Sequence, residues 1–494
     1  MSAFIRDAGR SVCLVLVLFL FAALSETASG DSQKPREYWP TTEWKTSTPE
    51  LQGLDPARLR VADAFVRERL PDAFSLLVVK NGYLVFEKYY SFGSSYKIAV
   101  VHSVTKSVTS ALIGIALEKG HLQSVDQKLI EFFPEYVSED SDPRRKQITI
   151  RHLLTMSAGF RWDDRGPSMA NWYTGLDWIE GAIQLPQDHS PGEVFTYNSS
   201  NSHILSAILT KATQTSTLDF ARANLFEPLG IASAYWRKDP QGYFIGGFGL
   251  GLSARDLAKI GFLYLNNGYW DGRSVVPEEW VQASTRLQIS AFGHPLYGRF
   301  GYGYQWWVKE VDGCRSFRAW GRRGQYIVVV PELDLVIAVT SNPQMPHPPT
   351  SIHYSPLFDL VATAVKRERP VKVPLKPVGL PEDAAAFVDR FNRAIADMDS
   401  AKIADTISDR FLAFGATKRM FLGVFLDTMS YVRTIKLVLT GFDVEGNIAR
   451  IEGAITDKYF ERPISPGMLL IKENGQWKWY GNQLQKIPAI EKIS

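Results

Sequence analysis

Hydrophobic and polar residues follow a strand-like pattern at two distant places in the first three quarters of the chain. Residues 74–79 and 83–90 are rich in β-branched and aromatic side chains, and Asn81-Gly82 between them is a strong hairpin signal. Similar runs return at residues 316–320, 325–330 and 335–340. From about 125 to 270, helical segments alternate with loops. The pattern therefore predicts an antiparallel sheet closed by distant segments, with helices and a helical subdomain inserted between them.

A helical period governs the stretch that follows the hairpin. Val108, Leu112 and Ile115 recur at helical spacing after residue 103, and Gly120 marks the end of the run. Because this segment is apolar nearly all round, we expect a buried helix. An earlier helix is expected from Asp55-Pro56 to about residue 70, with the aspartate as its cap.

A proline-rich stretch divides the chain. Four prolines between residues 370 and 381 cannot form a helix and predict a semi-rigid linker over 369–381. Beyond it, helices are expected around 387–395 and 403–407, and hairpins around Glu445-Gly446 and Asn474-Gly475. We therefore expect a main domain over 38–368 and a small α+β domain over 382–494.

The first thirty residues have the pattern of a secretory signal. Arg6 and Arg10 precede an apolar run over 12–24, which is followed by small and polar residues through Gly30. The run is shorter than the roughly 20 residues of a comfortable membrane span. We expect residues 1–30 to be a signal peptide and the protein to be exported, periplasmic or secreted. The alternative is a retained N-terminal membrane anchor.

Composition excludes some classes of partner. The 494 residues carry a formal charge of +3 with no long basic run, which argues against nucleic acid as a partner. Cys13 and Cys314 are the two cysteines, and removal of the signal would leave one thiol and no internal disulfide. We find no metal-ligand motif and no G-x-S-x-G elbow, so we expect neither a metal nor another cofactor.

The chemistry begins with Ser103 and Lys106. Residues three apart share a helix face, so the hydroxyl and the amine become neighbours if the helix begins at 103. Burial would lower the pKa of the lysine and let it act as a base toward the serine. Tyr197, in a turn-prone cluster just before a helical run, is a second acid or base if a nearby lysine lowers its pKa.

The order of these residues resembles the serine β-lactamase and penicillin-binding-protein superfamily, in its class C-like branch. The resemblance covers about residues 40–365 and includes family VIII esterases and 6-aminohexanoate-dimer hydrolases. It implies a β-lactamase-like fold in which Ser103 is acylated and Lys106 and Tyr197 carry the protons. Ser199 stands where many relatives have asparagine and is expected to bind the lysine or the substrate. The phrases that carry the resemblance, besides Ser103-Val104-Thr105-Lys106 and Tyr197-Asn198-Ser199, are Leu153-Leu154-Thr155-Met156-Ser157-Ala158-Gly159, Pro191-Gly192-Glu193, Leu225-Phe226-Glu227-Pro228-Leu229-Gly230 and Ala254-Arg255-Asp256-Leu257-Ala258-Lys259.

The third motif departs from the family pattern. Relatives that act on β-lactams carry lysine or histidine first in this triplet, whereas this chain has Ala319-Trp320-Gly321. The resemblance implies an oxyanion hole from the N–H groups of Ser103 and Arg322, which follows Gly321. Alanine donates no hydrogen bond, and Trp320 offers an apolar wall. Arg323, beside Arg322, adds positive charge nearby.

These observations favour hydrolysis of a small-molecule ester or amide through an acyl-enzyme. One alternative is a D-alanyl-D-alanine peptidase or true β-lactamase. Another is a non-catalytic binding or scaffold protein of the same fold. Loops near 160–190 and 285–300 are expected to set the substrate preference. We interpret His102 as a packing residue. The last hundred or so residues weakly resemble the NTF2-like cone and are expected to form an accessory or homodimerisation domain.

Overall fold

The computed structural model describes most of the chain beyond the predicted signal segment. The described residues are 36–164, 166–294, 298–344, 351–368, 377–413, 416–429, 434–459, 461–464 and 467–483. The predicted signal over 1–30 and residues 369–376 of the predicted linker lie outside them. Within the described residues, no helix has the length and apolar character needed to cross a membrane.

An eight-stranded antiparallel sheet organises the main domain. In spatial order the strands are β2 (Tyr83–Tyr89), β1 (Ala73–Lys80), β13 (Leu335–Ser341), β12 (Gln325–Val330), β11 (Phe317–Gly321), β10 (Trp307–Val308), β9 (Gly298–Tyr302) and β8 (Ile289–His294). Strands from the two ends of the domain pair directly, because Leu77 of β1 lies opposite Ala338 of β13. The predicted hairpin and the three later strands are confirmed. The sequence analysis did not predict β8, β9 and β10.

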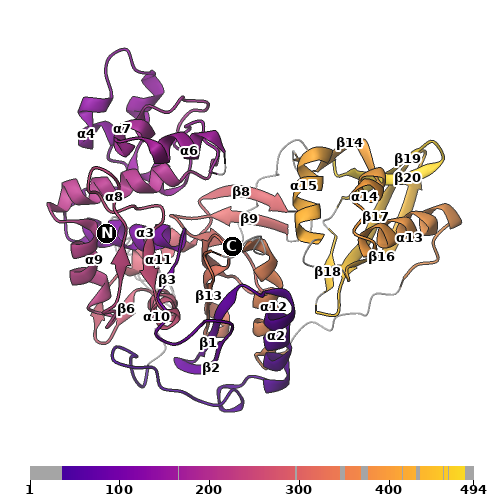
Figure 1. The fold of residues 1–494 in the computed structure, drawn as a ribbon, viewed down its shortest axis with the longest axis horizontal. Helices are drawn as coiled ribbons and strands as arrows, with labels where there is room; N and C mark the ends of the chain where they lie inside the picture. Colours follow the sequence, from indigo (N-terminus) through magenta and orange to yellow (C-terminus); the bar gives the residue numbers. More distant parts are fainter. Residues whose placement is uncertain are drawn as a thin grey trace, which may run out of the picture. The chain divides into compact units, whose positions relative to one another are not determined.

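Both faces of the sheet are covered, so its central strands are buried throughout. Side chains alternate between the faces of a strand. Leu76 and Val78 of β1 join the core beneath α2 (Pro56–Arg69) and α12 (Ser355–Ala364), whereas Leu77 and Val79 join the core on the opposite face. Figure 1 shows α2 and α12 side by side against the sheet. The second face receives α10 (Ala254–Leu265), against β1, β12 and β13, and α3 (Val104–Glu118), against β11 and β12.

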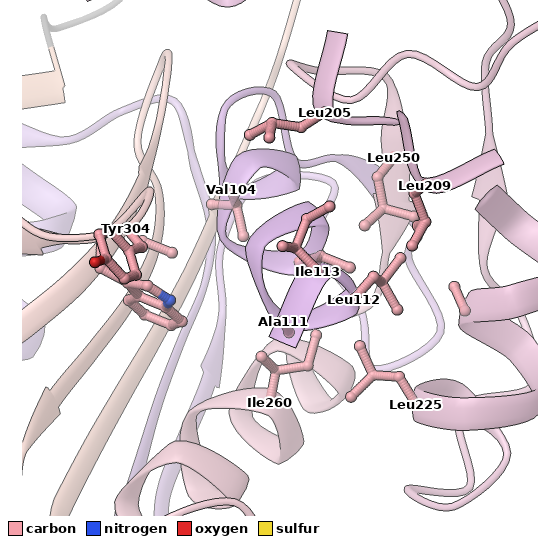
Figure 2. Packing of buried hydrophobic residues seen from close by; sticks show 14 of the residues in the cluster. Val104, Ala111, Leu112, Ile113, Leu205, Leu209, Leu225, Leu250, Ile260 and Tyr304 are labelled. Atoms are coloured by element: carbon pink, nitrogen blue, oxygen red, sulfur yellow. The ribbon is translucent and has the colours of Figure 1, made fainter. Parts of the chain in front are cut away.

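Helix α3 lies in the largest hydrophobic core of the protein. Its residues 104–116 are all buried, as the sequence pattern predicts. Figure 2 shows Leu112 and Ile113 of α3 between Leu205 and Leu209 of α8 (Ser199–Thr213) and Ile260 of α10. The helix that begins beside Ser103 is therefore held firmly from several sides.

The helical part of the main domain lies between β3 and β8 in sequence. Of its shorter helices, α5 (Ile150–Leu154), α7 (Trp178–Ile183) and α9 (Thr217–Ala221) pack directly on α8. The remaining elements of the main domain are η1 (Glu50–Gln52), β3 (Ala99–Val100), α4 (Leu129–Phe132), η2 (Pro134–Tyr136), η3 (Pro143–Gln147), α6 (Pro167–Thr174), η4 (Arg222–Phe226), β4 (Tyr235–Trp236), β5 (Leu250–Leu252), β6 (Tyr269–Trp270), β7 (Arg273–Ser274), α11 (Glu278–Thr285), η5 (Pro331–Leu333) and η6 (Ser351–Tyr354).

The C-terminal region forms a separate α+β arrangement. Its elements are α13 (Glu382–Ala396), α14 (Ser400–Asp405), β14 (Ile407–Ala413), β15 (Ala416–Thr417), α15 (Lys418–Met429), β16 (Lys436–Glu445), β17 (Ile448–Thr456), β18 (Glu461–Pro463), β19 (Leu469–Glu473) and β20 (Gln476–Gly481). Both predicted hairpins are confirmed. The expected second helix ends earlier than predicted, because Ile407 begins β14, and α15 interrupts the expected run of strands. The likeness to an NTF2-like cone stays a prediction.

Candidate active site

Ser103 is the N-cap residue of α3, and its side chain makes no capping hydrogen bond to the helix. The preceding His102 has a φ of 46°, a left-handed conformation that non-glycine residues rarely adopt. The Val101 N–H donates to the carbonyl oxygen of Leu250 at 2.8 Å, which fixes the entry of the chain into the helix. The serine hydroxyl therefore lies at the positive end of a 15-residue helix, whose dipole favours negative charge.

Lys106 is a buried polar residue of the site with three hydrogen-bond partners. Its side chain is 1% exposed, and burial, which disfavours the ammonium, lowers its pKa from 10.5 to about 8. Its Nζ lies 3.1 Å from Ser103 Oγ, 3.0 Å from Ser199 Oγ and 2.7 Å from the carbonyl oxygen of Gly247. The predicted pairing of Ser103 with Lys106 is thus present in the structure.

These three partners accept the three N–H bonds of the lysine ammonium, and two of them suffice for the neutral amine. A neutral lysine has two N–H donors and one lone pair. If Ser199 Oγ and the Gly247 carbonyl accept the two N–H bonds, the lone pair is left for the hydroxyl proton of Ser103. With a pKa of about 8, about a tenth of the lysine is neutral at pH 7, about 300-fold more than for an unperturbed lysine.

Tyr197 lies beside both residues. Its hydroxyl hydrogen-bonds the Ser103 side chain, and Lys106 Nζ lies 4.9 Å from the centre of its ring. Burial raises the pKa of this phenol well above its usual value, and the negative charge of Asp164 raises it further. The sequence analysis made its role depend on a lysine that lowers this pKa, and the structure shows the opposite shift. Tyr197 therefore stays protonated near neutral pH, which fits a proton donor better than a phenolate base.

Ser199 and Asp164 extend the site. Ser199 is the first residue of α8, and its N–H donates to Asp164 Oδ1 at 3.1 Å. The indole N–H of Trp162 donates to the same oxygen at 3.0 Å. Ser199 thus binds the lysine, as expected. Asp164 was not predicted as a site residue, although it lies in the 160–190 loop expected to influence the substrate.

Gly247 is a second residue that the sequence analysis missed. A Cβ at Gly247 would lie 2.7 Å from the carbonyl oxygen of Ser199, and one at Gly246 would lie 2.0 Å from that of Ser202. Only glycine lets this loop approach α8 closely enough for the Gly247 carbonyl to reach Lys106. The glycine-rich run over 246–251 is the sequence signal that could have drawn attention to it.

The end of β11 lies against the segment that leads into Ser103. A Cβ on Gly321 would come within 2.3 Å of the carbonyl oxygen of Val101, so this close approach also requires glycine. Arg322 follows with an exposed side chain. Burial, with the charges of Arg322, Arg323 and Lys106, lowers the pKa of His102 to about 4. His102 is therefore neutral near pH 7, and the role of the Arg322 N–H in an oxyanion hole stays a prediction.

The other two residues of the third motif point to opposite faces of β11. Ala319 is buried in the core that contains α3. Trp320 instead packs on Tyr326, with ring centres 6.0 Å apart, and on Trp307 at 5.1 Å. The ring that stacks on Tyr197, at 5.5 Å, is Trp307. The apolar wall beside Tyr197 is thus formed by Trp307, and Trp320 packs against Trp307. Trp320 and Ala319 face opposite sides of β11 because neighbouring residues of a strand alternate in direction.

The fold is a central antiparallel sheet between helices. A Ser-x-x-Lys pair lies at the start of a buried helix, and a tyrosine lies against the pair. This combination is typical of the serine β-lactamase and penicillin-binding-protein superfamily. The model of the Beta-lactamase family matches residues 62–355, more than half of the chain, and the protein belongs to that family. Membership of this family indicates hydrolase activity.

Proteins described as hydrolases are similar to this chain in sequence or in structure. A 6-aminohexanoate-dimer hydrolase of Paenarthrobacter ureafaciens is 26% identical over 317 residues, which cover 58% of this chain and 77% of that protein. The structure of a putative 6-aminohexanoate-dimer hydrolase from Bacillus anthracis has a TM-score of 0.53 at 21% identity and covers 65% of this chain and 87% of its own. That of EstCE1, described as a hydrolase with promiscuous acyltransferase activity, has a TM-score of 0.52 at 15% identity and covers 63% and 98%.

Proposed function

We propose that this protein is a serine hydrolase that cleaves an ester or an amide through a covalent acyl-enzyme on Ser103. The observation that carries the proposal is the placement of Lys106. Its buried amine, with a pKa lowered to about 8, lies 3.1 Å from the Ser103 hydroxyl and has acceptors for its two other bonds. A buried lysine held in this way is a base aimed at a nucleophile.

In the acylation step, Ser103 Oγ attacks the carbonyl carbon of the substrate and its proton passes to Lys106 Nζ. The backbone N–H groups of Ser103 and Arg322, with the positive end of α3, stabilise the negative charge that develops on the carbonyl oxygen. The bond between the carbonyl carbon and the leaving group then breaks. Tyr197, which stays protonated and bonds the serine, donates its proton to the leaving alcohol or amine and regains one from Lys106.

Deacylation reverses these roles. Water attacks the carbonyl carbon of the Ser103 ester and gives its proton to the now neutral Lys106 or, through Tyr197, to the same lysine. The bond to Ser103 Oγ breaks, and that oxygen takes back the proton. The product is a carboxylic acid, and the site returns to its starting state without a cofactor.

Substitution of Ser103 tests the proposal directly. The purified mature chain should hydrolyse short p-nitrophenyl esters and be labelled by a fluorophosphonate probe, and Ser103→Ala should abolish both. Ser110→Ala is the matched control, because Ser110 is buried on the same helix and its Oγ has no partner among the described residues. Full turnover by Ser103→Ala would contradict the proposal. A wild-type chain that neither turns over esters nor takes up the probe would instead support a binding or scaffold protein.

The choice of ester or amide over β-lactam follows from Ala319. The first position of the third motif carries a methyl group buried against α3, so it offers no donor to a substrate carboxylate. Membership of the Beta-lactamase family favours the competing function, a β-lactamase or D-alanyl-D-alanine peptidase. Nitrocefin turnover faster than p-nitrophenyl ester turnover, or stable labelling by fluorescent penicillin, would favour the β-lactamase or peptidase function.

Export and dimerisation are proposed from the sequence. If residues 1–30 are a signal peptide, the exported protein should begin near residue 30. N-terminal sequencing of the protein from the exported fraction of expressing cells measures this end. A homodimer through residues 382–494 predicts twice the monomer mass of the mature chain in sedimentation equilibrium. A monomer at all concentrations would contradict the dimer and leave the catalytic proposal intact.

A further inference from the structure

Asp164 is an acidic residue beside the site that has no role in the proposed acylation and deacylation steps. It lies outside the three sequence motifs, in the loop before α6, and is half-buried. Two donors, the Ser199 N–H and the Trp162 indole, fix its Oδ1. Trp162 is itself buried and packs edge-on against Trp172 with ring centres 5.7 Å apart. The carboxylate is therefore held in one place by the fold.

We propose that Asp164 is a positioning residue whose carboxylate stabilises the Lys106 ammonium that forms when Ser103 loses its proton. Ser199 connects the two charges, because its N–H binds Asp164 and its Oγ accepts from Lys106 Nζ. The inference rests on the proposed function. It adds a third member to the serine and lysine pair, in the same sense that a buried carboxylate supports the charged base of other serine hydrolases.

The charges around Lys106 agree with this role. Burial lowers the pKa of the lysine, and the charge of Asp164 acts against that lowering. The hydroxyl neighbours are neutral near pH 7, His102 is neutral above about pH 4, and Arg322 and Arg323 bear positive charge on the side of His102. The titratable and charged groups that face this region are His102 before α3, Asp164 in its loop, Tyr197 before α8, Tyr302 of β9, and Arg322 and Arg323 after β11.

Loss of the carboxylate should have two opposite effects. Without it the ammonium is less stable, so the pKa of Lys106 falls and more neutral base is present at low pH. The weaker base also accepts the serine proton less readily, so the maximal rate falls. A lower plateau together with an acid limb at lower pH is a signature that a simple loss of structure does not produce.

The experiment measures the second-order rate of Ser103 labelling by a fluorophosphonate between pH 5.5 and 10, with the full mature chain. The wild-type rate should be half-maximal near pH 8, as set by Lys106. Asp164→Asn and Asp164→Ser, which remove the charge but retain an oxygen acceptor, should move this midpoint down by about one unit and lower the plateau about tenfold. Asp164→Glu, which keeps the charge, should keep the midpoint.

Asp163→Asn is the matched control, because it removes one charge from the adjacent exposed position and should leave the midpoint unchanged. The inference is overturned if the charge-free Asp164 variants that label at Ser103 share the wild-type midpoint, or if Asp163→Asn shifts it equally. Two variants guard against a fold defect in one of them. If wild-type Ser103 is not labelled at all, the proposed function fails as well, so the two failures are distinguishable.

Discussion

Lowering the pH from 9 to 6 should switch the enzyme off through a single residue. Only the neutral amine of Lys106 can accept the Ser103 proton, and its pKa is lowered to about 8. The value of kcat/KM for an ester should therefore be half-maximal near pH 8. It should fall to about a tenth of its plateau at pH 7 and about a hundredth at pH 6, with unit slope.

The alkaline side of the profile should be flat up to about pH 10. Tyr197 must keep its proton to act as a donor, and burial raises its pKa above the usual 10. Burial of Lys106 also lowers the stability of the folded state at low pH, and this cost is relieved in this range. Because its folded pKa lies below its ordinary 10.5, the unfolded chain binds more protons than the folded chain between about pH 8 and 10.5, and this residue's contribution to stability rises with pH.

The assay is the initial rate of p-nitrophenyl acetate hydrolysis at constant ionic strength, with the Ser103→Ala background subtracted. Circular dichroism at each pH shows that the fold is retained. A midpoint at or below about pH 6.5 would refute the reasoning, because it would indicate an imidazole-like base. A fall between pH 8 and 10 in the rate for an amide substrate, whose leaving amine needs a proton, would refute the role given to protonated Tyr197.

Three further substitutions test the site and the core. Lys106→Met should abolish fluorophosphonate labelling of a folded protein, because it removes the base. Tyr197→Phe should reduce amide turnover by about a hundredfold or more and affect p-nitrophenyl esters less, since their leaving group needs no proton; equal losses would contradict its donor role. Leu112→Ala should cost about 2–5 kcal/mol in the free energy of unfolding by denaturant, whereas the exposed Leu51→Ala control should be nearly neutral.

Local signals predicted the elements that depend on local chemistry. Asn81 and Gly82 adopt φ angles of 52° and 89°, the left-handed pair that a two-residue hairpin turn requires, so the β1–β2 hairpin could be predicted from two residues. Helix α3 was predictable because its apolar residues recur at helical spacing, and Gly120, with a φ of 74°, ends it. The Ser103 and Lys106 pair is a consequence of that helix.

Other parts depend on contacts that no local pattern contains. Lys106 reaches the carbonyl of Gly247 across 141 positions of sequence, and Asp164 reaches Ser199 across 35. Strand β10 has two residues, too short for a recognisable alternation, and forms because β9 and β11 lie on either side of it. The pKa of Tyr197 could not be predicted from the sequence either, because burial and the charge of Asp164 raise it whereas the nearby lysine was expected to lower it.

The residues of the third motif have different structural constraints. Gly321 must stay glycine, because its Cα lies against the Val101 carbonyl that leads into Ser103. Ala319 is two residues earlier, faces the same side of β11 and is buried in the core that contains α3, so it presents no polar group there. Since a methyl group cannot bind a carboxylate, positive charge for a substrate anion would have to come from Arg322 or Arg323. Uncharged esters and amides need no such partner, and this is the physical reason for proposing them over β-lactams.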